Sequence, residues 1–155
     1  MAISFHFETK TKLIQRRLLK LFLADIIVKE KGNIGNLSFV FCSDPFLLDI
    51  NIKHLNHNYF TDIITFHFKN EESKLTDGEI YISIDRVTDN SNKYKTTFED
   101  ELNRVIFHGV LHLCGYKDKS RAEKEQMRKK EDFYLKRYKS FVPRGTRQFS
   151  STWNT

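Results

Sequence analysis

The segment His108-Gly-Val-Leu-His112-Leu-Cys-Gly115-Tyr-Lys-Asp118 carries the strongest signal about fold and chemistry in this sequence. Its two histidines stand four positions apart, so on a helix they lie on one face with their Cβ atoms ~5–6 Å apart. From that distance two imidazoles can bind the same metal ion. Gly115 suits the position after a helix end, and the turn there can bring Asp118 back towards the histidines. The spacing therefore predicts a metal site formed by His108, His112 and Asp118.

Three protein ligands would leave the fourth position of a tetrahedral zinc ion open, which is the arrangement of a catalytic metal. Metzincin proteases share this spacing, but there a Glu follows the first histidine and acts as the general base. Gly109 occupies that position here, which argues against peptide hydrolysis. Cys114 lies two positions after His112, roughly on the opposite face of the helix, and we interpret it as a core residue.

The sequence on both sides of the motif predicts the helices that flank it. Residues 97–100 resemble a capping box and open a helix whose apolar residues share one face. Ser120 and Glu123 have the capping-box spacing and open an amphipathic helix that runs to about Tyr138. Because this pair supplies the cap, the Asp118 carboxylate is free to bind a metal.

Strand and helix patterns alternate along the rest of the chain. Alternating or β-branched apolar residues predict four strands, at residues 3–7, 37–42, 61–68 and 78–85. Helical apolar spacing predicts a helix over residues 11–30, with Thr11 as its candidate cap, and a short helix from a Ser43 cap to about Leu55. The short polar loop between the last two strands predicts that they are antiparallel. These elements predict an α+β fold, in which a small mixed sheet of about four strands packs with about five helices and a metzincin-like helix carries the metal ligands.

Positive charge is concentrated at the C-terminal end. The 155 residues, enough for about one domain, carry a net charge of +6, and no acidic residue follows Asp132. The basic residues beyond it are Lys136, Arg137, Lys139, Arg144 and Arg147, and the aromatic residues around them are Tyr134, Tyr138, Phe141, Phe149 and Trp153. Such a mixture suits a single-stranded nucleic acid, although many chain ends of this kind are simply solvated. We predict a single domain over residues 1–140 and a basic aromatic tail over residues 141–155.

Cysteine content and hydropathy predict a cytoplasmic protein. Cys42 and Cys114 are far apart and form no C-x-x-C motif, which excludes a disulfide scaffold or a cysteine zinc ribbon and favours a reducing compartment. The N-terminal residues lack the pattern of a signal peptide. The longest stretches without a charge, residues 32–43 and 105–116, are shorter than the ~18 residues of a membrane-spanning helix.

The metal motif also resembles that of a known family. It is similar to the signature H-G-x-L-H-L-x-G-Y-D-H of the YbeY family of bacterial metal-dependent endoribonucleases, and residues 108–116 match every fixed position. The family's Leu-Asn and Thr-Asp-Val-Leu-Ser-Phe segments resemble Ile50-Asn51 and Thr61-Asp-Ile-Ile-Thr-Phe66 at the same separation. Its Gly-Asp-Ile before an Ile-Ser strand resembles Gly78-Glu-Ile80. The resemblance extends from about residue 3 to residue 138.

This resemblance implies a metallohydrolase domain with zinc-dependent endoribonuclease activity on single strands. It implies a role in small-subunit (16S) ribosomal RNA 3′-end maturation and in ribosome quality control. The implied partners are single-stranded RNA and the small ribosomal subunit, and neither DNA nor a membrane. His108, His112 and Asp118 would be both the metal ligands and the catalytic residues. Two histidines and one aspartate would also accept Ni²⁺ or Fe²⁺ in place of Zn²⁺.

Two functional positions depart from the family pattern. Asp118 replaces the last histidine of the signature, which removes one unit of positive charge from the site. Leu55 stands where the family has an arginine that is expected to hold substrate phosphate, and the candidates to replace it are Lys53, His54 and His57. The missing arginine leaves open a non-catalytic ribosome- or RNA-binding factor with a structural metal. The metal spacing leaves open a zinc metallopeptidase.

Overall fold

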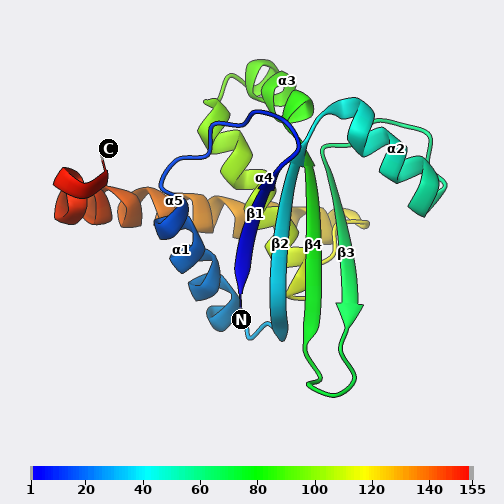
Figure 1. The fold of residues 1–155 in the computed structure, drawn as a ribbon, viewed down its shortest axis with the longest axis horizontal. Coiled ribbons are helices and arrows are strands. Elements are labelled where there is room, and N and C mark those ends of the chain that lie inside the picture. The colour runs from blue at the N-terminus through cyan, green and yellow to red at the C-terminus, as the bar shows by residue number, and fades with distance from the viewer. Residues whose placement is uncertain (1, 154–155) are drawn as a thin grey trace.

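Four strands and five helices make up the described part of the chain. In the computed structural model the backbone is described for residues 2–153 and side chains for residues 2–142. The elements, shown in Figure 1, are β1 Ile3–Phe7, α1 Arg16–Lys29, β2 Ile34–Cys42, α2 Asp44–Leu55, β3 Ile63–Lys69, β4 Thr76–Ser83, α3 Ile84–Tyr94, α4 Phe98–Leu113 and α5 Arg121–Trp153. The expected α+β fold, with about four strands and about five helices, is confirmed.

The sheet is mixed, with the strand order β1-β2-β4-β3. Strands β1, β2 and β4 are parallel, whereas β3 is antiparallel to β4, as the polar loop between these two strands predicts. Ile80 of β4 pairs with Phe39 of β2 on one side and with Thr65 of β3 on the other. Strand β3 is therefore an edge strand, with its free side available to border a binding site.

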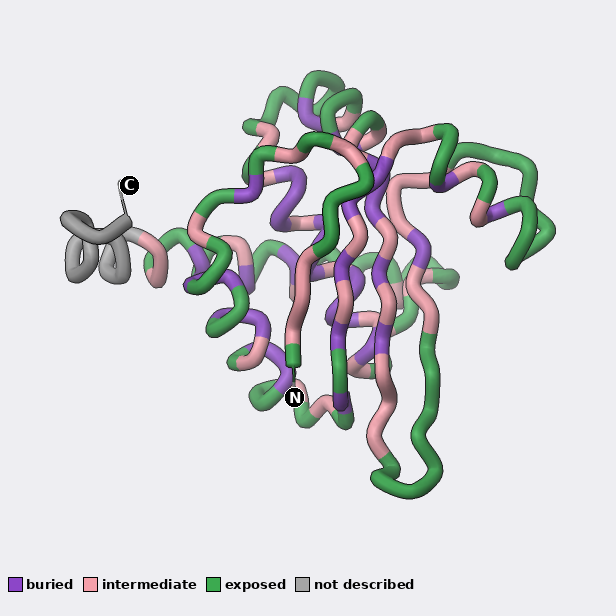
Figure 2. Tube along the Cα trace, in the orientation of Figure 1, coloured by how far each residue is buried: buried purple, intermediate pink, exposed green. Residues whose placement is uncertain are grey.

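Side chains alternate between the two faces of the sheet, and the helices divide accordingly. Ile80 and Ile82 of β4 belong to the main core with α1, α4 and α5, whereas Tyr81 packs with Leu47 of α2 in a smaller cluster on the other face. Figure 2 shows the resulting alternation of buried and half-buried positions along β2 and β4. Helix α4 contacts the sheet as well as α1, α3 and α5, so it is the central element of the fold.

The first helix begins later than its apolar spacing predicts. Helix α1 starts at Arg16, and the Thr11 hydroxyl donates to the Thr9 carbonyl, so Thr11 is not the cap. Gln15, at the start of the helix, has the left-handed φ of 53°. The spacing misleads because Leu13 is buried in the core while its backbone lies outside the helix.

Helix α3 is not among the elements expected from the sequence, because most of its residues are polar. Its apolar residues Ile84, Val87 and Tyr94 have helical spacing, but Val87 is the single one of the three that is buried, so the stripe is short and weak. The expected strand over residues 78–85 ends two residues early, because the Ser83 hydroxyl caps α3 by accepting from the Arg86 N–H at 3.2 Å.

The last helix is longer than expected, and two of its tyrosines have a different role. Helix α5 begins at its predicted Ser120 cap but continues past residue 138 and crosses residues 140 and 141 without a break. Tyr134 and Tyr138 are buried in the main core, so the interpretation of them as part of a nucleic-acid-binding tail is wrong. The side chains of Arg144, Arg147, Phe149 and Trp153 lie outside the described residues. No helix in the described ranges is both long and apolar enough to cross a membrane.

Glu30, directly after α1, is a nearly buried carboxylate shared by three donors. The Tyr116 hydroxyl donates to it at 2.6 Å, the Lys130 ammonium at 3.1 Å, and the Tyr134 hydroxyl also donates to it. Burial alone would raise the pKa of Glu30, but these hydrogen bonds and the charge of Lys130 hold the pKa below its ordinary value. The cluster ties α1 to α5 and to the turn that follows α4.

Because the pKa of Glu30 is lower in the folded chain than in the unfolded one, ionised Glu30 stabilises the fold at neutral pH. This contribution is lost as the pH falls through the folded-state pKa. We predict that Glu30→Gln lowers the free energy of unfolding by about 1–3 kcal/mol at neutral pH. The difference in the free energy of unfolding between Glu30→Gln and the wild type should become smaller below about pH 4.

Urea unfolding of both proteins at neutral pH and at about pH 3.5 measures the two differences. Glu125→Gln is the control, because Glu125 is an exposed carboxylate on α5, and it should change stability by less than ~0.5 kcal/mol. A Glu30→Gln deficit of the same size at both pH values would contradict the prediction.

Candidate metal site

Helix α4 presents the two histidines because its start and its packing are both fixed. The Thr97 hydroxyl accepts a hydrogen bond from the Asp100 N–H at 3.0 Å and caps the helix, as its sequence predicts. At Gly109 the helix lies so close to the sheet that an added Cβ would be 2.9 Å from Ile80 Cδ1 and 3.0 Å from Ile63 Cδ1. Position 109 therefore faces the sheet. A Glu there, as in metzincins, would be buried among isoleucines.

The turn after α4 brings the chain back over the histidines. Gly115 has a φ of +107°, a conformation that favours glycine, and the Tyr116 N–H donates to the Leu111 carbonyl at 3.0 Å. The Tyr116 side chain is anchored on Glu30. On the far side of the turn, Ser120 and Glu123 form the expected reciprocal capping box, with hydrogen bonds of 2.8 and 3.1 Å. The turn is thus fixed at both ends, and its middle carries Asp118.

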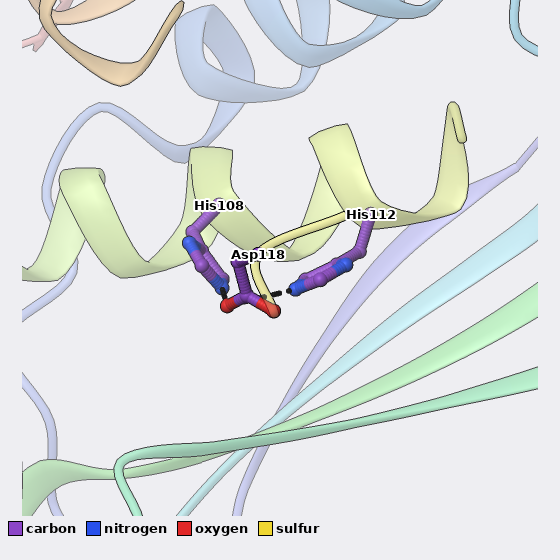
Figure 3. A group of neighbouring side chains, drawn as sticks. All are labelled: His108, His112 and Asp118. Atoms are coloured by element: carbon purple, nitrogen blue, oxygen red, sulfur yellow. Dashed lines mark ion pairs between the residues drawn. The ribbon is translucent and has the colours of Figure 1, made fainter. Parts of the chain in front are cut away.

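The structure brings His108, His112 and Asp118 together. Figure 3 shows the Asp118 carboxylate between the two imidazoles, with dashed lines to both rings. Asp118 Oδ2 lies 3.2 Å from His108 Nε2 and 3.4 Å from His112 Nε2, and the three ligand atoms are all within 4.8 Å of one another. A tetrahedral zinc ion with bonds of ~2.1 Å separates its ligand atoms by ~3.4 Å. The three residues could therefore hold one metal ion, and all three are partly exposed to solvent.

Glu131 of α5 orients the first histidine from behind. The Nδ1–H of His108 donates to Glu131 Oε2 at 2.6 Å, which leaves Nε2 facing Asp118. The other carboxylate oxygen of Glu131 accepts from Arg104 Nη1 at 2.9 Å. Burial lowers the pKa of His108, but the hydrogen bond and charge of Glu131, with the charges of Asp118 and Asp62, outweigh it and raise the pKa. Such a carboxylate fixes the ring tautomer that a metal needs.

Sequence reasoning missed Glu131 and Arg104 as parts of the site. Glu131 is 23 positions from His108, and no local pattern connects an acidic residue on one amphipathic helix to a histidine on another. Asp62, which lies in one of the segments that resemble the family, lines the same hollow as the histidines, and no local sequence pattern predicts this. Burial raises the pKa of Asp62, partly opposed by the charge of His108.

The candidate metal site opens into a hollow of about 1250 Å³, called the groove below. Strand β3, helices α3, α4 and α5 and the loop between α2 and β3 contribute to its lining. Of the three candidates to replace the family arginine, His57 lines the groove, as does the uncharged Leu55. Lys53 instead pairs with Asp49 at 3.0 Å, and His54 packs edge-on against Phe66.

We predict that Glu131→Gln weakens zinc binding by about 10- to 100-fold, because the amide holds His108 less firmly and makes its ring a weaker ligand. Competition with a chromophoric chelator measures the dissociation constant. Asp132→Asn is the matched control, since Asp132 also pairs with Arg104, at 2.6 Å, but is exposed and touches neither histidine in the described contacts. Equal zinc affinities for the two variants, with both proteins folded, would contradict the orienting role.

Comparisons with known proteins identify a family and a similar solved structure. A family model described as Endoribonuclease YbeY matches residues 3–139. The chain is 50% identical over 133 residues to the endoribonuclease YbeY of Karelsulcia muelleri, covering 86% of this chain and 93% of the relative. It is 49% identical over 131 residues to that of Cytophaga hutchinsonii, covering 84% and 91%. The solution structure of TM1509 from Thermotoga maritima matches with a TM-score of 0.60 at 27% identity, covering 90% of this chain and 93% of that one. The chain therefore belongs to the endoribonuclease YbeY family.

Proposed function

We propose that this protein is a zinc-dependent endoribonuclease that cleaves single-stranded RNA. The observation that carries the proposal is the group of His108, His112 and Asp118, whose ligand atoms converge within 4.8 Å at a large groove. Relatives up to 50% identical that are named endoribonuclease YbeY support RNA as the substrate. The donor set suits Zn²⁺, and Ni²⁺ or Fe²⁺ are alternatives that it would also accept.

Each residue of the site has a separate task in this proposal. A zinc ion held there would supply a Lewis acid for the scissile phosphate and would lower the pKa of water at the site. His108 and His112 would hold the ion through Nε2, and Glu131 keeps His108 in the tautomer that leaves this nitrogen free. Asp118 contributes the single negative charge of the donor set, so the loaded site keeps a net positive charge towards the phosphate.

The proposed cellular role follows from the family. We propose that the substrate is the 3′ end of small-subunit (16S) ribosomal RNA and that the protein also acts in ribosome quality control, with the small ribosomal subunit as its partner. The cytoplasm is the proposed location, which fits the free thiols of Cys42 and Cys114. The metallopeptidase alternative is disfavoured because position 109, where a metzincin carries its general base, faces the sheet.

The proposed ligands make a specific prediction about metal content. Because the three residues would share one ion, removing any one should damage the same site, so the losses should be strongly non-additive. We expect His108→Ala, His112→Ala, Asp118→Ala and the triple variant each to lose most bound zinc and most cleavage of a short single-stranded RNA. Elemental analysis and gel assays measure the two quantities. Wild-type zinc content in His112→Ala would contradict the ligand assignment, whereas zinc without any RNA cleavage by the wild type would favour a structural metal.

The charge of the proposed aspartate ligand, Asp118, leads to a prediction about the pH dependence of cleavage. Asp118→His replaces a negative ligand by a neutral one, so the loaded site becomes one unit more positive and water there more acidic. The rising limb of the cleavage rate against pH should move to lower pH. Rates are measured across the pH range for both proteins at equal zinc content. A limb that does not move would show that deprotonation at the metal does not limit cleavage.

A further inference from the structure

Helix α5 presents a row of charged side chains to the groove. Lys124, Arg128 and Glu131 all line it, and their spacings of four and three residues place them on one face of the helix. Glu131 accepts a hydrogen bond from His108, so this face of α5 is turned towards the candidate metal site. The two cations therefore lie one and two turns along α5 from the carboxylate that orients the metal ligand.

These two cations are not held in ion pairs by the described residues. Arg104, the third Lys or Arg of the groove lining, is paired with Glu131 at 2.9 Å and with Asp132 at 2.6 Å. Among the described residues, Lys124 and Arg128 form no ion pair with a carboxylate, and both are exposed. Burial raises the pKa of Glu101, and the positive charges of Arg104 and Arg128 partly oppose this. Two unpaired cations at a groove are suited to an anionic ligand.

An aromatic ring contributes to the same groove from the loop between α2 and β3. Tyr59 lines the groove and is 56% exposed, although its surroundings hold it in place. The Asn51 side chain donates to its carbonyl at 2.9 Å, and its ring stacks on that of His57 with centroids 5.2 Å apart. An exposed ring on a fixed backbone can stack on a nucleobase.

We propose that Lys124 and Arg128 bind backbone phosphates of single-stranded RNA and that Tyr59 stacks on one of its bases. This inference rests on the endoribonuclease function proposed above, because it assigns the path of the same substrate. Phosphates meet the unpaired cations and a base meets the aromatic ring, which is the combination used by proteins that bind single strands. Lys124 and Arg128 also supply positive charge to a groove in which Leu55 stands at the position of the family arginine.

The cations are tested with the double variant Lys124→Gln, Arg128→Gln in the full-length, zinc-loaded protein. Binding of a labelled single-stranded RNA is measured by fluorescence anisotropy at several salt concentrations, over times shorter than cleavage. We expect affinity to fall roughly tenfold and the slope of log K against log salt to become shallower by about 1.4, since each phosphate contact on a single strand contributes about 0.7. The matched control is Arg121→Gln, Lys129→Gln, which removes the same charges from α5 at two exposed positions outside the groove lining.

Loss of stacking by Tyr59 should affect RNA affinity but not its salt dependence, in contrast to loss of the two cations. Tyr59→Ala should weaken binding by roughly tenfold without changing the salt slope, because a ring carries no charge. Tyr59→Phe keeps the ring and should bind within about twofold of the wild type. A changed salt slope in Tyr59→Ala, or equal losses in the alanine and phenylalanine variants, would overturn the stacking role.

The outcomes separate this inference from the function on which it rests. If the wild type binds and cleaves the RNA but the groove and control double variants lose affinity equally, or neither loses any, the assignment of Lys124 and Arg128 is wrong and the endoribonuclease proposal stands. If the wild type binds with the expected dependence on both cations but does not cleave, the binding path stands and the catalytic proposal fails. If the wild type neither binds nor cleaves single-stranded RNA, both are overturned.

Discussion

The geometry of the site depends on the hydrogen bonds that Arg104 and His108 donate to the buried carboxylate of Glu131. Glu131 is 6% exposed, and a charge so far from water must be compensated by hydrogen bonds and opposite charge. Arg104 and His108, one turn apart on α4, both donate to it. The same contact that satisfies the charge therefore fixes the position of α5 against α4 and the direction in which His108 Nε2 points.

A second, nearly buried carboxylate, that of Glu30, holds α5 from its other side. Glu30 accepts from Lys130 and Tyr134, which flank Glu131 along the helix, and also from Tyr116 in the turn that carries Asp118. The turn and the helix thus share one anchor. Because Asp118 belongs to that turn and Glu131 to that helix, the distance between the candidate ligands depends on packing far from the metal position itself.

Charge is distributed unevenly around the groove. Carboxylates lie close to the histidines, where a cation would offset them, whereas Lys124 and Arg128 lie further along α5 with no carboxylate paired to them in the described contacts. Such an arrangement suits a metal ion at one place and, as proposed above, a polyanion beside it. One helix, α5, thus supports both features, the first through Glu131 and the second through residues one and two turns away.

The sequence by itself determined the elements with strong local signals. The capping pairs at Thr97 and Ser120, the four-residue spacing of His108 and His112 and the left-handed Gly115 are set by backbone geometry over a few residues, so they could be predicted without a fold. Only the tertiary structure decided the remainder, because it depends on which side chains become buried. Leu13 packs into the core outside a helix, Tyr134 and Tyr138 turn inwards, and polar α3 forms on a serine cap. The contact of Glu131 with His108 joins residues 23 apart on different helices, and periodicity along the chain carries no information about such a pair.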